Sequence, residues 1–219
     1  IKFKFKNKIY DQTAMNITFK HTKSNSTKPR QIFYDNEILG LLPINEYSYN
    51  LIWSMPNKFF DQVNKASSAT LLEYLSDRVS FVTGDIKKTN IHTSFPLSSR
   101  HASSYFCENN LLIGDAAHKF HPLAGLGLNM GIEDVATLSN LLSKSNNLRG
   151  TVCNFTIKRM SRIQALQQLL DLIVSFHSSD ILSAKLKLKI LDYFNKTNYL
   201  KPKIIENATG LNNKDLVNL

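Results

Sequence analysis

The chain contains 219 residues, 42% of them hydrophobic and 20% charged, and its formal net charge is +10. This composition is typical of a globular protein and excludes an intrinsically disordered one. No apolar run in the sequence reaches the roughly 18 residues that a helix spanning a bilayer needs. The lysines are scattered and lack the aromatic platforms that stack on bases, so we expect no nucleic-acid partner. We interpret the charge as a solvated basic surface, with an anionic membrane surface as the alternative partner.

The N-terminal part of the sequence has the two-residue period of β-strands. Apolar residues alternate with lysines over residues 1–6, and a second alternation covers residues 15–20. Further strands are predicted at residues 37–42, 47–55 and 91–97. Together these segments predict an antiparallel sheet with one covered face.

One face of the 47–55 strand carries four large apolar side chains, which are Tyr49, Leu51, Trp53 and Met55. We interpret this face as part of the core, with a wall of a substrate pocket as the alternative. Residues 57–79 have a helical spacing of apolar side chains, with a break near Ser67. Helical spacing resumes at Ile132 and continues through most of the C-terminal part of the chain.

The most specific pattern lies at residues 111–129. Three apolar residues lead into Gly114 and Asp115, as in a buried strand that ends at a ligand. A proline and two closely spaced glycines follow, just before a helical pattern begins. Glycines let backbone N–H groups approach a flat or anionic ligand, and the helix directs its positive end to the same place. This pattern predicts a cofactor site formed by Gly114, Asp115, Pro122, Gly125, Gly127, Leu128 and Asn129.

The same residues carry a resemblance to a known family. Gly-Asp-Ala-Ala-His at 114–118, followed by His-Pro-Leu-Ala-Gly-x-Gly-Leu-Asn at 121–129, resembles the flavin-contacting motif of FAD-dependent aromatic hydroxylases of the p-hydroxybenzoate hydroxylase type. The form found here most resembles the hydroxylases of ubiquinone biosynthesis. Weaker matches extend from Tyr10 to Val135, and the similarity fades after about Arg162.

The resemblance implies a role for each residue of the motif. The carboxylate of Asp115 would bind the ribityl chain of FAD, with a turn or helix-capping aspartate as the alternative. Backbone N–H groups would face the pyrimidine edge of the flavin from Gly125, Gly127, Leu128 and Asn129, while Pro122 would pack beside the ring. The family usually has a polar residue where this chain has Leu126.

The resemblance also implies a mixed fold, α+β combined with α/β. It would consist of an antiparallel substrate-domain sheet with helices at 1–97, the flavin-contacting segment of a Rossmann-like FAD-binding domain at 98–145, and a helical region at 146–219. The Gly-x-Gly-x-x-Gly turn that holds the ADP half of FAD in this family does not occur among the eight glycines. We therefore expect this chain to be the C-terminal portion of a longer hydroxylase, and to bind FAD weakly or not at all when isolated.

The implied activity is FAD-dependent hydroxylation of the aromatic ring of a polyprenylated ubiquinone precursor. NAD(P)H or a ferredoxin-type carrier would supply the electrons, and no catalytic acid or base is identified. A flavin hydroxylase of another, soluble aromatic substrate and an inactive scaffold that retains the fold are the alternatives. A prenylated substrate implies that the protein lies peripheral to the inner membrane, on the matrix face in mitochondria or on the cytoplasmic face in bacteria. The resemblance also implies membership of a ubiquinone-biosynthesis complex. The basic segment 182–194 could rest on anionic lipid, or could pack on its own domain.

No metal site is predicted. His118 and His121 are three residues apart, but no carboxylate or thiol has a matching spacing. Cys107 and Cys153 have neither a metal-binding nor a redox spacing, so we expect two reduced thiols.

Overall fold

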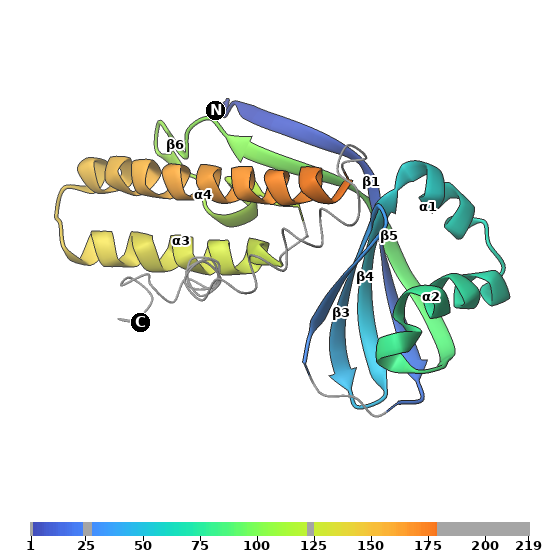
Figure 1. Cartoon of the computed structure of the whole chain (residues 1–219). Helices are drawn as coiled ribbons and strands as arrows, with labels where there is room; N and C mark the ends of the chain where they lie inside the picture. The colour runs from blue at the N-terminus through green and yellow to red at the C-terminus, as the bar shows by residue number, and fades with distance from the viewer. Residues whose placement is uncertain (1, 24–27, 122–124, 179–219) are drawn as a thin grey trace. The chain divides into compact units, whose positions relative to one another are not determined.

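The computed structural model describes residues 2–23, 28–121 and 125–178. They divide into two compact units, one within Ile9–Leu97 and the other formed by the described residues up to Lys8 and from Ser98 onward (Figure 1). Two long strands, β1 and β5, contribute residues to both units. Among the described residues no helix is both long enough and apolar enough to cross a membrane.

The Ile9–Leu97 unit is built on an antiparallel sheet whose strands follow the predicted alternation. Strand β4 is paired to β1 from Gln12–Pro56 to Lys20–Ser48, and β3 lies on the other side of β4. The whole sheet has the order β2-β3-β4-β1-β5-β8, in which β8 and the outer ends of β1 and β5 belong to the other unit. Its strands are β1 (Phe5–His21), β2 (Arg30–Tyr34), β3 (Glu37–Asn45), β4 (Ser48–Pro56), β5 (Ile86–Ala102) and β8 (His118–Lys119). The alternation at residues 15–20 thus lies within one strand of 17 residues, which includes only Phe5 and Lys6 of the first alternation.

Two helices, α1 (Asn57–Asn64) and α2 (Ser68–Thr83), cover one face of this sheet (Figure 1). The predicted break near Ser67 is confirmed, because its hydroxyl accepts a hydrogen bond from the amide of Thr70 at 3.1 Å and caps α2. Leu75 and Val79 of α2 pack onto the covered face. All four large side chains of β4 are buried there, so they are core residues, as we interpreted them: Tyr49, Leu51, Trp53 and Met55.

A buried ion pair crosses this core. The guanidinium of Arg78 donates two hydrogen bonds to the carboxylate of Glu37, at 2.6 and 2.7 Å. The indole N–H of Trp53 donates to the same carboxylate at 2.7 Å. Four aromatic rings lie within 6 Å of the guanidinium carbon, those of Tyr34, Trp53, Phe59 and Tyr74. Local sequence patterns do not predict this arrangement, because Glu37 and Arg78 are 41 residues apart.

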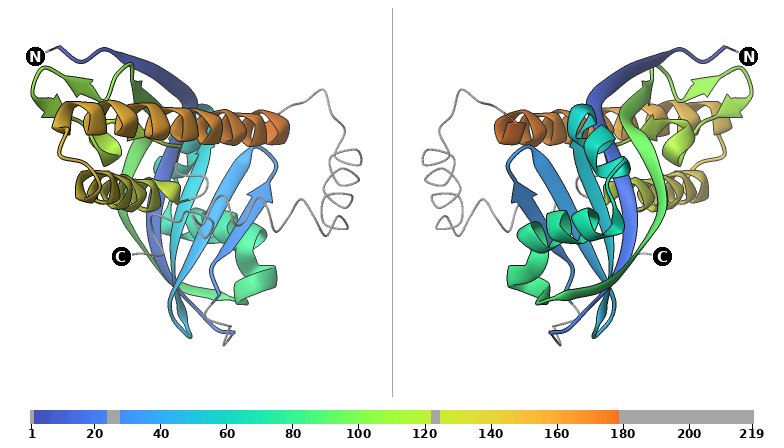
Figure 2. Two further views of the ribbon diagram at one scale, coloured as in Figure 1. Left: turned by 90° about the vertical axis from the view of Figure 1, so that its left-hand side faces the viewer. Right: turned by 90° about the vertical axis from the view of Figure 1, so that its right-hand side faces the viewer.

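The second unit contains two helices packed side by side, α3 (Leu126–Ser143) and α4 (Leu148–Ser178) (Figure 2). Before them come a hairpin of β6 (Phe106–Cys107) and β7 (Asn110–Leu111) and a single 3-10 turn, η1 (Gly114–Ala116). The mixed α and β fold predicted from the sequence is confirmed. The predicted basic helix at 182–194 lies outside the described residues.

The first residues of the chain lie in the same unit as the segment that begins at Ser98. The carbonyl of Lys4 accepts a hydrogen bond from the amide of Ser103 at 2.8 Å, and Arg100 lies over the ring of Phe5. The division into compact units therefore falls after residue 8 and again after residue 97, and the boundaries at 97 and 145 that the resemblance implies stay a prediction. Helix α4 packs on α3, so residues on both sides of 145 share one unit.

Candidate functional site

Helix α3 begins at the place that the sequence motif predicts. Its N-terminal capping residue is Gly125, whose φ of 59° lies in the left-handed region that favours glycine. No described atom lies within 4 Å of the place where a Cβ would stand on Gly125. Leu128 and Asn129 are exposed. The first N–H groups of a helix have no partner within the helix, so this end can donate hydrogen bonds to a ligand.

Asp115 lies beside the first turn of α3. Its Oδ1 is 3.6 Å from the position that a Cβ on Gly127 would occupy, and its side chain is exposed. The structure thus brings together Asp115 and Gly127, which are 12 residues apart in the sequence. Pro122 lies outside the described residues. The assignment of these residues to a cofactor stays a prediction.

The turn that carries Asp115 packs closely on α3 through two glycines. A Cβ built on Gly131 would lie 3.6 Å from the Cα of Gly114, which is an ordinary van der Waals distance. Gly114 has a φ of 56°, whereas Gly131 lies inside α3. The expected strand at residues 111–113 is shorter than predicted, because within the described chain only Asn110 and Leu111 pair with the β6 segment.

Replacing each of these two glycines by alanine is expected to change the free energy of unfolding in opposite directions. Gly131→Ala should stabilise the unit by up to about 1 kcal/mol, because alanine favours a helix over glycine and the added methyl group fits. Gly114→Ala should destabilise it by roughly 1–2 kcal/mol, because a Cβ strains the left-handed conformation. Urea unfolding followed by circular dichroism measures both changes. A loss of stability in Gly131→Ala would show that the packing is tighter than described.

Beneath this turn lies a buried network of charged side chains that the sequence analysis missed. Asp134 of α3 accepts hydrogen bonds from the amide of Gly114, from Nε2 of His118 and from Nε of Arg159, at 2.7, 2.7 and 2.6 Å. Glu133 pairs with the same Arg159 at 3.1 Å and with Arg162 at 2.8 Å. The side chains of Glu133, Asp134 and His118 are fully buried. The network joins the turn, α3 and α4.

The network fixes the charge state of Asp134. Burial by itself would raise the pKa of this carboxyl, but the bonds with His118, the Gly114 amide and Arg159 outweigh it and lower the pKa. Asp134 is therefore ionised at neutral pH. The Nε2–H of His118 donates to the carboxylate, and Nδ1 of His118 has no hydrogen-bond partner among the described residues.

The sequence contains one signal for this network, the adjacent carboxylates Glu133 and Asp134, which lie within the stretch of weaker family matches that ends at Val135. The helical spacing of Ile132 and Val135 suggested that these two residues face the core, yet they are 49% and 52% exposed. The buried face of α3 instead carries the two carboxylates, because the arginines of α4 pair with them.

His121, at the end of the described segment before α3, is also buried. Burial lowers its pKa to about 4, with Asp171 raising it and Lys8 lowering it by smaller amounts. Above pH 6.5 the imidazole is neutral in the folded and unfolded chain. Between pH 6.5 and 4 the unfolded chain takes up a proton that the folded chain does not, so stability falls with falling pH.

We expect His121 to make the unit acid-sensitive. The free energy of unfolding should fall by up to roughly 3 kcal/mol between pH 6.5 and pH 4, since one pKa unit corresponds to about 1.4 kcal/mol. Thermal melts across this range would measure the slope, and His121→Gln should flatten it. An equal slope in the two proteins would assign the acid sensitivity to other groups, such as His101, whose pKa burial also lowers.

No group of three or more potential metal ligands occurs among the residues that the structure describes. His118 is engaged with Asp134, and its ring lies 5.4 Å from that of Phe120. Cys107 is half-buried and Cys153 exposed, and both are free thiols.

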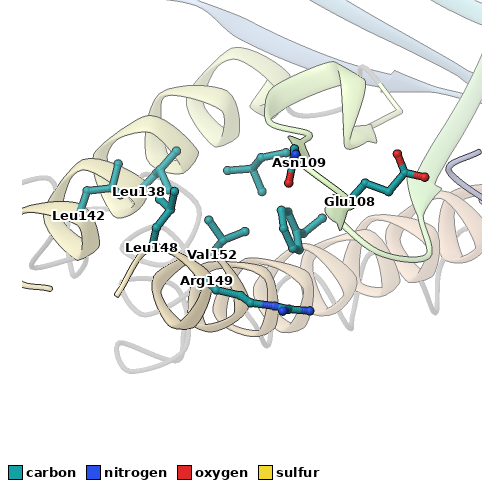
Figure 3. A pocket seen from close by; sticks show the side chains of 9 residues that line it. Glu108, Asn109, Leu138, Leu142, Leu148, Arg149 and Val152 are labelled. Atoms are coloured by element: carbon teal, nitrogen blue, oxygen red, sulfur yellow. The ribbon is translucent and has the colours of Figure 1, made fainter. Parts of the chain in front are cut away.

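A cavity of about 750 Å³ lies in the same unit, by the far end of α3. Leucines of α3 and α4 face the β6–β7 hairpin across it (Figure 3). None of the predicted cofactor residues that the structure describes lines this cavity. Its lining consists of Phe106, Glu108, Asn109, Leu111, Leu138, Leu142, Leu148, Arg149 and Val152.

Comparison with known families agrees with the motif. The model of a family described as an FAD binding domain matches residues 1–154. This chain therefore belongs to the FAD binding domain family, and the resemblance seen at residues 114–129 is confirmed.

Among curated proteins, the chain is similar to the mitochondrial ubiquinone biosynthesis monooxygenase COQ6 of Xenopus tropicalis, at 32% identity over 52% of this chain and 32% of that protein. It is also similar to the ubiquinone hydroxylase UbiM of Neisseria meningitidis, at 26% identity over 61% of this chain and 29% of that protein. The chain spans about one third of the length of the curated relatives it matches.

Solved structures share the fold at low identity. The anhydrotetracycline hydroxylase OxyS of Streptomyces rimosus superposes with a TM-score of 0.65 at 14% identity, over 96% of this chain and 43% of that chain. PqsL of Pseudomonas aeruginosa, in complex with 2-aminobenzoylacetate, gives 0.64 at 18% identity over 80% of this chain and 50% of that chain.

Proposed function

We propose that this chain is the flavin- and substrate-contacting part of an FAD-dependent monooxygenase that hydroxylates the aromatic ring of a polyprenylated ubiquinone precursor. The observation that carries the proposal is the start of α3 with the carboxylate of Asp115 beside it. Family membership and the names of the relatives support the cofactor and the pathway.

The described residues fit a flavin. Asp115 is exposed and can accept hydrogen bonds from the hydroxyl groups of the ribityl chain. The amides of Gly127 and Leu128 in the first turn of α3 can donate to the electron-rich edge of the ring system, whereas that of Asn129 is at the position that bonds to the carbonyl of Gly125. The helix dipole favours negative charge at this end. When bound, FAD supplies the redox chemistry that activates oxygen. The residues of this chain would bind the ring and orient it.

We assign the aromatic substrate to the face of the sheet that α1 and α2 do not cover. Asn16 and Thr18 of β1, and Asn50 of β4, lie on this face, because side chains alternate along a strand and their neighbours are in the core. Thr18 Oγ1 lies 2.6 Å from Nε2 of His92. The Oδ1 atoms of Asn16 and Asn50 are buried and have no hydrogen-bond partner among the described residues, so this face carries unsatisfied polar groups.

A prenylated substrate would reside in the membrane, so we further propose that the protein is peripheral to the inner membrane, within a ubiquinone-biosynthesis complex. The net charge of +10 supports an attraction to anionic lipid. Flotation with liposomes that contain or lack anionic lipid tests this part alone. Binding that ignores the anionic lipid would remove the electrostatic argument.

The activity is tested on the whole gene product that carries this chain. It would be loaded with FAD and supplied with oxygen, a short-chain prenylated phenol, and either NAD(P)H or a reduced ferredoxin. The proposal predicts a product one oxygen atom heavier, detected by mass spectrometry, with isotope from labelled oxygen gas. Hydroxylation of unprenylated phenols alone would favour the flavin hydroxylase of a soluble substrate. Bound FAD that no donor reduces would favour the inactive scaffold.

A further inference from the structure

We propose that Asp134 is a positioning residue for the flavin-contacting turn, and that Arg159 of α4 fixes the orientation of its carboxylate. The proposal rests on the proposed function, because it assumes that the turn carrying Asp115 contacts the flavin. The evidence for the positioning itself comes from the hydrogen bonds of the buried network alone.

The two oxygens of Asp134 bond in different directions. Oδ2 accepts from the amide of Gly114 and from His118, and both bonds are 2.7 Å long. Oδ1 accepts from Nε of Arg159 at 2.6 Å. The Asp134 side chain is fully buried and that of Arg159 is 2% exposed, so water does not compete for these bonds.

The bond to Gly114 constrains the residue immediately before Asp115. Its amide is held by Asp134, while its carbonyl accepts from the amide of Ala117 at 2.9 Å and closes the turn. The peptide groups on both sides of Gly114 are therefore fixed. The exposed side chain of Asp115 is held by a turn that cannot rotate without breaking a buried, charge-assisted bond.

Arg159 supplies the rigidity that Asp134 alone would lack. Its guanidinium donates to the Asp134 carboxylate, pairs with Glu133 at 3.1 Å and donates to the carbonyl of Met130 at 3.2 Å. These contacts fix the guanidinium against α3, and with it the Oδ1 side of Asp134. The start of the flavin site is thereby tied to α4, which the motif at residues 114–129 does not include.

An asparagine at position 134 would disturb this arrangement in a defined way. Its side chain has one acceptor oxygen and one donor nitrogen, whereas all three partners of Asp134 donate hydrogen bonds. The side-chain NH2 of the asparagine would then point either at Arg159 or at Gly114 and His118, and would place a donor against a donor. Glu133→Gln serves as the control because Glu133 is equally buried; it weakens one contact of Arg159 but keeps all three acceptor bonds of Asp134, so a smaller effect is expected.

The experiment compares Asp134→Asn with Glu133→Gln in the whole gene product, using two readouts. Hydrogen exchange of the amides at 112–117, measured without FAD, should speed up about tenfold or more in Asp134→Asn relative to Glu133→Gln. The FAD dissociation constant, from flavin fluorescence titration, should rise by about tenfold in Asp134→Asn and by less than about threefold in the control. Arg159→Lys keeps the positive charge, so it should shift both readouts in the same direction as Asp134→Asn but by a smaller amount. It replaces Asp134→Asn in the experiment if that variant does not fold.

The outcomes separate the two proposals. Equal exchange at 112–117 in Asp134→Asn and Glu133→Gln would overturn the positioning role. Faster exchange only in Asp134→Asn with an unchanged FAD dissociation constant would also overturn it, because the turn would move without affecting the flavin. Faster exchange in a protein whose unaltered form binds no FAD would support the role of Asp134 in holding the turn and would overturn the proposed function.

Discussion

Replacing Asp115 by alanine is expected to weaken FAD binding by about 10- to 100-fold in the whole gene product. A hydrogen bond to a charged group contributes about 1.5–3 kcal/mol, and the exposed carboxylate beside the start of α3 is the candidate acceptor for the ribityl hydroxyls. Stability should change by less than about 0.5 kcal/mol, because an exposed side chain is removed. Fluorescence titration with FAD and a thermal melt measure the two quantities.

Glu108→Ala provides the control for this experiment. Glu108 is another exposed carboxylate of the same unit, and it lines the cavity by the far end of α3. The change in charge is the same, so a general electrostatic effect would appear in both variants. If Asp115→Ala retained FAD with less than a roughly twofold change in affinity, Asp115 would be a turn residue without a ligand role.

The second large effect concerns the stability of the Ile9–Leu97 unit. Arg78→Met should destabilise it by about 3–5 kcal/mol, because the Glu37 carboxylate would remain buried with Trp53 as a neutral partner. Trp53 is the single tryptophan of the chain and lies in this core, so its fluorescence reports the urea unfolding of this unit.

The double variant Glu37→Gln with Arg78→Met separates charge burial from lost packing. It removes both charges and retains an oxygen that can accept from the indole of Trp53, so it should recover most of the lost stability. A double variant as unstable as Arg78→Met alone would mean that the guanidinium acts through its contacts with the aromatic rings.

Local patterns in the sequence predicted the elements well. The alternation along β1 and β4 places apolar side chains on one face, and the hydroxyl of Ser67 caps a helix where the break was expected. These features depend on neighbouring residues, so they can be read from a single chain. The positions of Asp115 and the glycines around α3 were predicted from a motif with fixed spacing, and the structure places Asp115 beside Gly127.

Taken alone, the sequence determined the long strands β1, β3, β4 and β5, the helices that the structure describes, the family and the turn that is the candidate flavin site, because each depends on residues close together in the chain. Only the tertiary structure decided which face of α3 is buried and which partners its carboxylates have. Asp134 meets Arg159 across 25 residues, and Glu37 meets Arg78 across 41. A charged side chain is buried only when an opposite charge reaches it, and helical periodicity, which ranks residues by their hydrophobicity, assigns such side chains to the solvent.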